Sequence, residues 1–126
     1  MFKFIGETLR QARIQAEDVD RLVVGVGPGS YTGLRTSIMA AKAIAMPGGK
    51  QVIGISSGDA IAERANAEHG ERRVTVAGDA RRSQFWYRHY EFHEGVMAPQ
   101  DAWMLVNAVS FGSICRQGFC LATPDW

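Results

Sequence analysis

The amino-acid sequence predicts an α/β fold with short buried strands. Two apolar runs, Leu22–Val26 and Gln51–Ile55, are each followed by turn residues and a helix-forming segment, which is typical of strands that lie parallel in a sheet. After Gly70 the helical pattern gives way to alternating apolar residues, which predicts a β-hairpin. This change of pattern divides the chain into residues 1–70 and residues 71–126.

The first two expected helices both carry apolar faces. A helix from Phe4 to Ala16 is indicated by Ile5, Leu9 and Ala12, which follow one another at steps of four and three residues. A second helix, about Leu34–Met46, is apolar on nearly every side because alanines stand beside larger apolar residues. We expect it to be buried in its domain or covered by a second subunit. The Pro-Gly-Gly sequence that follows ends it.

The remaining elements are indicated by shorter patterns. A third helix, about Gly58–Glu68, is expected to point Ile61 and its alanines inward. The hairpin then has its turn at Gly78–Ser83 and its second strand at Phe85–Phe92. Met104–Val109 is expected to be a strand or a short helix, and the tail beyond it has no assignment.

The glycine-rich segment between the first strand and the second helix is the candidate ligand-binding motif. Its glycines can adopt positive φ and let the backbone approach a ligand, and free N–H groups at a helix start attract anions. Neither a P-loop nor a dinucleotide fingerprint is complete, because Thr32 stands five positions after Gly27 and no Lys follows Gly33. Two interpretations stay open, a close strand-to-helix turn and an anion-binding loop. The residues concerned are Gly27, Pro28, Gly29, Ser30, Tyr31, Thr32, Gly33 and Arg35.

The other chemically active side chains favour structural roles. His89 and His93 lie four residues apart on an expected strand, hence about 13 Å apart, too far to share a metal ion, and ordinary surface or edge positions are expected for them. Asp79 and Arg81 are expected to form a structural pair that fixes the hairpin turn. The sequence has no Ser-His-Asp order and no paired carboxylates with a catalytic signature, so we expect no catalytic residue, no metal and no cofactor.

Length and charge limit the function classes. A chain of 126 residues has room for one ordinary domain. Fourteen basic and thirteen acidic side chains leave a formal charge of +1, which gives no strong field to attract nucleic acid or an anionic membrane. The apolar runs are shorter than the ~20 residues of a spanning helix, and the first residues lack a signal-peptide pattern. We therefore expect a cytoplasmic protein with no membrane contact.

The glycine-rich segment also carries a family resemblance. GPGSYTGLR at Gly27–Arg35 resembles the GPGSFTGLR signature of the TsaB (YeaZ) family, bacterial partners in making the threonylcarbamoyladenosine modification of transfer RNA. The similarity continues through the alanine-rich Ala40–Ala45, through VIGISSGDAIA at Val52–Ala62 and through GDARRSQFWYRHY. It covers roughly Asp18–Phe92.

This resemblance implies a fold of the actin, sugar-kinase and Hsp70 type (ASKHA), in which a mixed β-sheet carries flanking helices and a second related lobe follows. Family members begin with strands that form the centre of the first sheet, whereas this chain starts at the first helix. The resemblance thus implies a first lobe that is incomplete at its N-terminus, residues 1–70, followed by the beginning of a second lobe, residues 71–126.

The resemblance also implies a function. Family members are non-catalytic scaffold subunits that bind the catalytic paralogue TsaD and the ATPase TsaE, and they meet tRNA only indirectly, through the complex. The helices Phe4–Ala16 and Leu34–Met46 match the partner-binding helices, and a homodimer is left open. The expected interface residues are Ile5, Leu9, Ala12, Leu34, Ile38, Ala41 and Ala45.

Two interpretations of other classes compete with this one. The first is a nucleotide-dependent phosphotransferase or peptidase of the same fold class, in which the Gly27–Gly33 loop holds phosphates. The second is a tRNA-binding module, which the near-neutral charge disfavours because phosphate contacts need many basic side chains.

Overall fold

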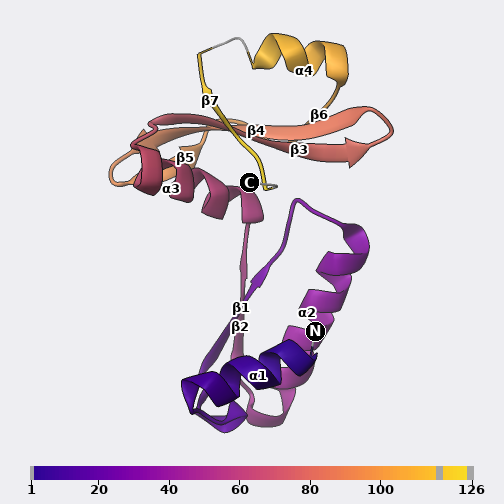
Figure 1. Cartoon of the computed structure of the whole chain (residues 1–126), viewed down its shortest axis with the longest axis vertical. Helices are drawn as coiled ribbons and strands as arrows, with labels where there is room; N and C mark the ends of the chain where they lie inside the picture. The colour runs from indigo at the N-terminus through magenta and orange to yellow at the C-terminus, as the bar shows by residue number, and fades with distance from the viewer. Residues whose placement is uncertain (1, 116–117, 125–126) are drawn as a thin grey trace. The chain divides into compact units, whose positions relative to one another are not determined.

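The computed structural model describes residues 2–115 and 118–124 and contains two compact units, of which the first reaches Ser56 and the second begins at Ser57 (Figure 1). The first unit comprises helix α1 (Phe2–Ala12), the 3-10 turn η1 (Ala16–Asp18), strand β1 (Arg21–Gly25), helix α2 (Tyr31–Ala45), the 3-10 turn η2 (Met46–Gly48) and strand β2 (Gln51–Ile55). The second comprises helix α3 (Ser57–His69), strands β3 (Arg73–Arg81), β4 (Gln84–His93), β5 (Val96–Pro99) and β6 (Met104–Asn107), helix α4 (Ala108–Ile114) and strand β7 (Cys120–Ala122).

In the first unit, β1 and β2 form a two-stranded parallel sheet. Their register runs unbroken from the first residue of each strand to the last, which confirms the expected parallel pairing. Helix α2 packs on one face, where Val24 is buried. Ala41 and Ala45 are only 7% and 5% exposed, because small side chains let a helix approach a sheet closely. On the other face, Val23 is 62% exposed.

Helix α1 is shorter than the expected Phe4–Ala16. The chain leaves the helix at Arg13, whose φ is +57°, and the Ile14 N–H donates to the Leu9 carbonyl at 3.1 Å. This left-handed residue with a hydrogen bond back into the last turn is the usual way in which a helix ends. Ala16 continues the apolar spacing of the helix in the sequence, but in the structure it belongs to the separate turn η1.

Helix α2 begins earlier than the expected Leu34. Ser30 is its N-cap: the Ser30 hydroxyl accepts a hydrogen bond from the Gly33 N–H at 3.4 Å, and the Ser30 carbonyl accepts one from the Leu34 N–H at 2.8 Å. At the other end Gly49 has a φ of +59°, and the Lys50 N–H donates to the Ala45 carbonyl at 3.0 Å. The Pro-Gly-Gly sequence therefore ends the helix as predicted.

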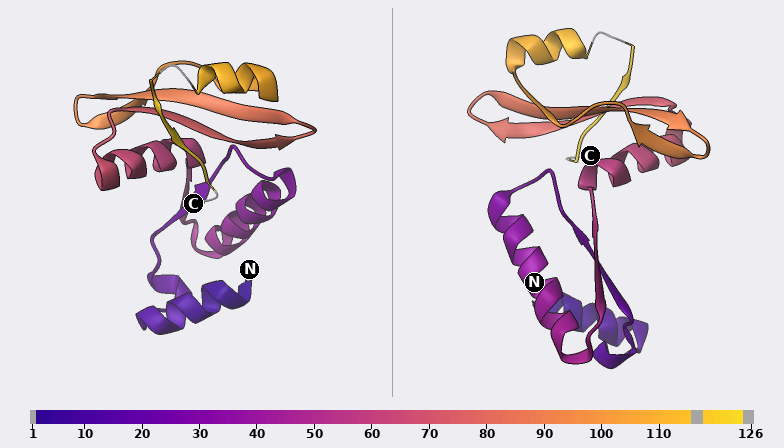
Figure 2. Two further views of the ribbon diagram at one scale, coloured as in Figure 1. Left: turned by 45° about the horizontal axis from the view of Figure 1, so that its top comes forward. Right: turned by 180° about the vertical axis from the view of Figure 1, so that it is seen from behind.

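In the second unit, a five-stranded sheet lies between two helices. The strand order is β5-β4-β3-β7, and β6 pairs with β4. Helices α3 and α4 lie on opposite faces of this sheet (Figures 1 and 2). The β3–β4 hairpin confirms the prediction from alternating residues, but the expected turn at Gly78–Ser83 is too long because β3 continues to Arg81. Strand β5 and the parallel strand β7 carry no clear sequence signal. The segment expected to be a strand or a helix is both: β6 ends at Asn107, whose side chain caps α4.

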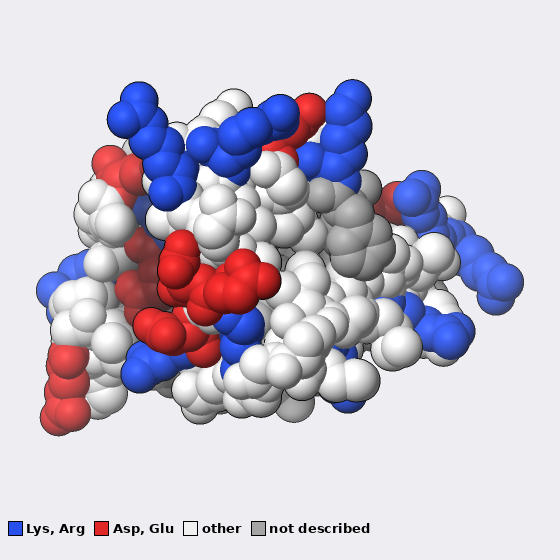
Figure 3. All heavy atoms as spheres, turned by 90° about the horizontal axis from the view of Figure 1, so that it is seen from below, with Lys and Arg blue, Asp and Glu red and all other residues white. Residues whose placement is uncertain are grey.

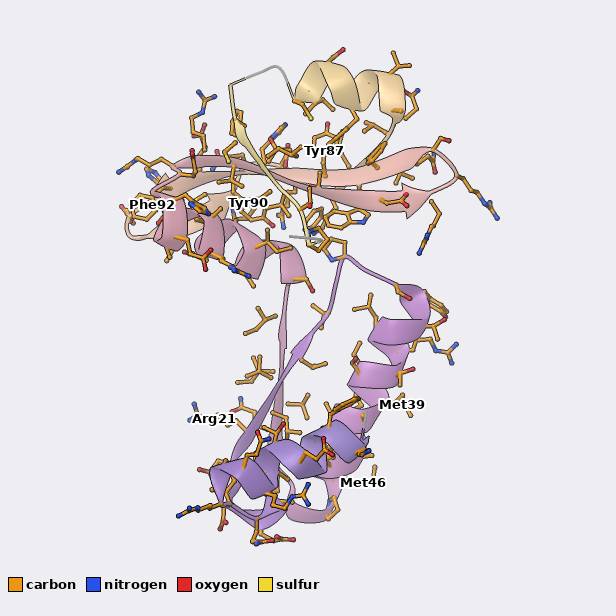
Figure 4. The ribbon with its side chains drawn as sticks, viewed as in Figure 1. Arg21, Met39, Met46, Tyr87, Tyr90 and Phe92 are labelled. Carbon is orange, nitrogen blue, oxygen red and sulfur yellow. The ribbon has the colours of Figure 1, made fainter. Side chains whose placement is uncertain are left out.

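The core of the second unit lies between α3 and the sheet. Ala62 of α3, Val74 and Val76 of β3 and Tyr90 of β4 are each 0% exposed. The Tyr90 hydroxyl donates to Asp59 Oδ1 at 2.7 Å, so the one polar group of this side chain has a partner inside the packing. Tyr90 and Phe92 point to the α3 side of β4, as Figure 4 shows. Tyr90 and Phe92 therefore serve the packing of the sheet against α3.

The packing of α3 explains where the compact units divide. The sequence predicts a boundary between residues 70 and 71, where the hydrophobic period changes. The structure divides the chain between Ser56 and Ser57, because α3 buries its apolar side against β3 and β5 of the second unit. A change of secondary-structure type is therefore a poor guide to where packing changes.

The close packing of α3 against the sheet leads to the first prediction. A Cβ at Gly58 would clash with the Trp103 ring and would lie 3.0 Å from the Tyr90 hydroxyl. Gly58→Ala should therefore lower the free energy of unfolding by about 1–3 kcal/mol, measured by urea denaturation with tryptophan fluorescence. Gly112→Ala in α4 is the matched control, since nothing lies within 4 Å of its added methyl group. Equal stability of both variants would contradict this packing.

The second prediction concerns the thiol of Cys120 on β7. Burial raises the pKa of the Cys120 thiol, and the Glu71 carboxylate raises this pKa further. Because the folded chain holds the thiol proton more tightly than the unfolded chain, this group contributes its full stabilisation at pH values below the unfolded-state pKa. The contribution is lost as the pH rises through the folded-state pKa. In a Cys115→Ser variant, the pH midpoint of iodoacetamide labelling at Cys120 should be higher in the folded chain than in urea, as followed by mass spectrometry. Equal labelling midpoints in the folded chain and in urea would show that the fold does not raise the pKa of the Cys120 thiol.

Candidate functional site

The glycine-rich segment forms a close turn between β1 and α2. Gly27 is buried with a φ of +97°, and a Cβ at this position would lie 3.0 Å from Cδ1 of Leu34. Only glycine combines this backbone conformation with such a close approach of the helix. Gly29, in contrast, has open space around it. The first of the two sequence interpretations, a strand-to-helix turn, accounts for the geometry of the segment without a ligand.

Several residues of the candidate motif belong to the helix rather than to the loop. Tyr31, Thr32, Gly33 and Arg35 are all in the first turns of α2. The Arg35 guanidinium lies 5.4 Å from the centre of the Tyr31 ring, and its Nη1 donates to the Tyr31 hydroxyl at 3.5 Å. These two side chains therefore form a pair on the surface of the helix and do not converge on the turn.

The outward side of α2 is an exposed and largely apolar surface, which we call the α2 outer face. Tyr31 is 72% and Met39 65% exposed, and a shallow hollow of about 540 Å³ runs along this side. Met39 and, just beyond the helix, Met46 are labelled in Figure 4. Large exposed apolar residues grouped on one side of a helix are typical of protein-binding surfaces. The α2 outer face consists of Tyr31, Thr32, Arg35, Thr36, Met39 and Ala43.

The structure buries part of the expected interface on α2. Ala41 and Ala45 of the expected interface pack against this chain's own strands, and Leu34 and Ile38 are half-buried. The sequence could not separate the two sides because α2 is apolar nearly all round. The spacing of Tyr31, Arg35 and Met39, every fourth residue, is the signal that marks the outward side.

The expected interface residues of α1 are partly accessible. Ile5 and Leu9 are half-buried and Ala12 is exposed. Phe4, which is not among the expected interface residues, is 70% exposed. Phe4, Ile5 and Leu9 line a second apolar hollow of about 290 Å³. Helix α1 therefore presents apolar side chains in addition to those of the α2 outer face.

The predicted pair of Asp79 and Arg81 lies at the hairpin of the second unit. The Arg81 N–H donates to Asp79 Oδ1 at 2.6 Å, and Nη1 of Arg81 lies 4.0 Å from Asp79 Oδ2. Arg81, Arg82 and Ser83 all have positive φ, from +53° to +70°. A side-chain acceptor that holds the first of these residues is a common feature of such turns.

The histidines differ in environment. His93 is exposed, whereas His89 is half-buried, so the expected surface or edge position is wrong for His89. Thr75 Oγ1 and His89 Nδ1 are hydrogen-bonded at 2.9 Å, and the His89 ring packs 4.8 Å from that of Phe119. Within residues 2–115 and 118–124, no group of three or more His, Cys, Asp or Glu side chains could hold a metal ion.

The charges give no continuous basic surface on the face that Figure 3 shows. There, Asp and Glu side chains gather in one area, and Lys and Arg side chains are scattered around a broad uncharged area. This pattern does not resemble the basic stripe that a nucleic-acid interface needs. Among the described residues, no helix is long and apolar enough to cross a membrane.

Comparisons with solved structures give the same fold. The chain superposes on YeaZ from Pseudomonas aeruginosa with a TM-score of 0.76 at 27% identity, over 84% of this chain and 50% of that one. A second crystal structure, of an uncharacterized Pseudomonas aeruginosa protein with similarity to peptidase YEAZ, gives a TM-score of 0.77 at 27% identity, over 84% of this chain and 49% of that one.

Comparisons of sequence identify the family. A family model described as "TsaD: tRNA N6-adenosine threonylcarbamoyltransferase" matches residues 1–110. The tRNA threonylcarbamoyladenosine biosynthesis protein TsaB of Bacillus subtilis is 32% identical over 74% of this chain and 40% of its own length. The protein of the same name from Escherichia coli is 35% identical over 71% and 39%. The chain thus spans about two fifths of the length of these relatives. With the signature at Gly27–Arg35, these matches show that the chain belongs to the TsaB (YeaZ) family.

Proposed function

We propose that this chain is a non-catalytic scaffold subunit in tRNA threonylcarbamoyladenosine biosynthesis and that it binds TsaD through α1 and the α2 outer face. It works in the cytoplasm as part of an assembly that also includes TsaE, and it meets tRNA only through that assembly. The names of the relatives support the pathway. The observation that carries the docking role is the exposure of Tyr31 and Met39 on the same side of α2.

The composition of the α2 outer face supports protein binding. Tyr, Arg and Met are enriched in the central parts of protein–protein interfaces, where Tyr and Arg often contribute most of the affinity. Tyr31, Arg35 and Met39 follow one another at intervals of four residues, so one partner surface can contact all three. The cation–π contact between Arg35 and Tyr31 holds two of these side chains in place before a partner arrives.

The family fold supports the same proposal. On this view the two units correspond to parts of two ASKHA lobes. The parallel strands with α2 on one face, and the hairpin followed by a parallel strand, suit such lobes. In this arrangement the glycine turn at Gly27 sets the direction in which α2 leaves β1.

The first test changes one residue of the α2 outer face. Met39→Glu places a charge at the centre of the proposed interface and should weaken binding to purified TsaD by at least about tenfold, measured by calorimetry. Val109→Glu is the control, because Val109 is 84% exposed on α4 in the other unit. Unchanged affinity of Met39→Glu would overturn the interface. A homodimer through the same face would instead appear as a dimer that Met39→Glu converts to a monomer in sedimentation.

A second test addresses the nucleotide-binding alternative. An enzyme that holds phosphates on the Gly27–Gly33 turn predicts saturable ATP binding by the chain alone. We expect no binding heat, because Gly27 and Ser30 already serve the packing and capping of α2 and no lysine follows Gly33. Saturable ATP binding that Ser30→Ala abolishes would favour the enzyme instead.

A further inference from the structure

Lys50 joins two connections of the first unit through its side chain. Its Nζ donates to the main-chain carbonyls of Ala16 at 2.7 Å, Glu17 at 3.0 Å and Val19 at 2.6 Å. An ammonium group has three N–H donors, and these three carbonyls use all of them. Such a charge-assisted cluster is stronger and more directional than a single neutral hydrogen bond.

The main chain and the Nζ atom of Lys50 contact different parts of the unit. The three carbonyls belong to η1 and the residue after it, in the connection between α1 and β1. The Lys50 main chain lies in the connection between α2 and β2, where its N–H donates to the Ala45 carbonyl at 3.0 Å. The stem of the side chain passes close to Gly48, where an added Cβ would lie 3.1 Å from Cε of Lys50. One residue therefore ties the end of α2 to the segment that follows α1.

Helix α1 has little other packing to fix its direction. Phe4 is 70% exposed, Ala12 is exposed, and Ile5 and Leu9 are only half-buried. A helix held by so few buried side chains takes its orientation from the connection at its end. That connection is the one that Lys50 holds.

From this geometry we propose that Lys50 is a positioning residue that fixes the direction of α1 relative to the end of α2, so that the apolar side chains of α1 and the α2 outer face can contact the same partner. The inference rests on the proposed function, and it adds a residue that touches no partner itself. Replacement of a positioning residue should loosen α1 and η1 alone, whereas replacement of a residue that merely stabilises the unit would loosen all of its elements. The loss of affinity on replacing Lys50 should also depend on the side chains that α1 presents.

The first experiment locates the effect. Lys50→Met keeps the aliphatic stem and removes all three donors, and Lys42→Met removes an exposed lysine of α2 as a control. In Lys50→Met, amide hydrogen exchange should be at least about tenfold faster in residues 2–19 and unchanged in residues 31–45. Lys50→Arg should give an intermediate effect, because a planar guanidinium cannot direct three donors to one cluster. Exchange in residues 2–19 that matches the wild-type chain would overturn the inference.

The second experiment tests coupling to binding with a double-mutant cycle. Lys50→Met alone should weaken TsaD binding about tenfold, and it should have a much smaller further effect in a Phe4→Ala, Leu9→Ala background, because α1 then presents little apolar surface besides Ile5. In a Met39→Ala background its full effect should remain. Equal effects in all backgrounds would overturn the inference. If the wild-type chain does not bind TsaD, the proposed function fails, and the exchange experiment still decides the role of Lys50.

Discussion

The close packing of α2 on two parallel strands determines most of what the first unit can do. Gly27 turns the chain with a φ of +97° and leaves room for Leu34, and Ala41 and Ala45 let the helix lie close to the strands. Met39 stands two residues before Ala41, hence almost opposite it on the helix, and with Ala41 packed inward Met39 is 65% exposed. Tyr31, in the first turn, is 72% exposed. The proposed docking surface is thus the side of α2 that this packing leaves uncovered.

Elements with a local cause were predictable from the sequence, and elements that depend on distant contacts were not. The strands β1 and β2 are apolar runs bounded by turn residues, and both lie within one residue of the expected positions. The strand β7 has only three residues and exists because it pairs with β3, far away in the sequence. The sequence places the start of α2 too late, at Leu34, because Gly33 is unfavourable inside a helix, although Ser30 is a good N-cap.

The candidate site shows the same limit at the level of side chains. The apolar sequence of α2 indicates that the helix is buried in its domain or covered by a second subunit. The sequence cannot indicate which side of α2 faces a partner, because a helix that is apolar on nearly every side has no single apolar face. Lys50 carries no sequence signal at all, since its three acceptors are main-chain carbonyls that only the fold brings together.

The first unit exposes apolar side chains on two sides, and this bears on how any association should be interpreted. Val23 and Ile55 are 62% and 43% exposed on the strands, where α2 does not cover them. Strand edges and uncovered sheet faces associate with little specificity, whereas a helix face with a fixed order of Tyr, Arg and Met selects its partner by shape. Binding through the sheet would be insensitive to a charge on α2 but sensitive to one at Val23. The identity of the sensitive residue, more than the affinity itself, therefore distinguishes a specific partner from adhesion through the sheet.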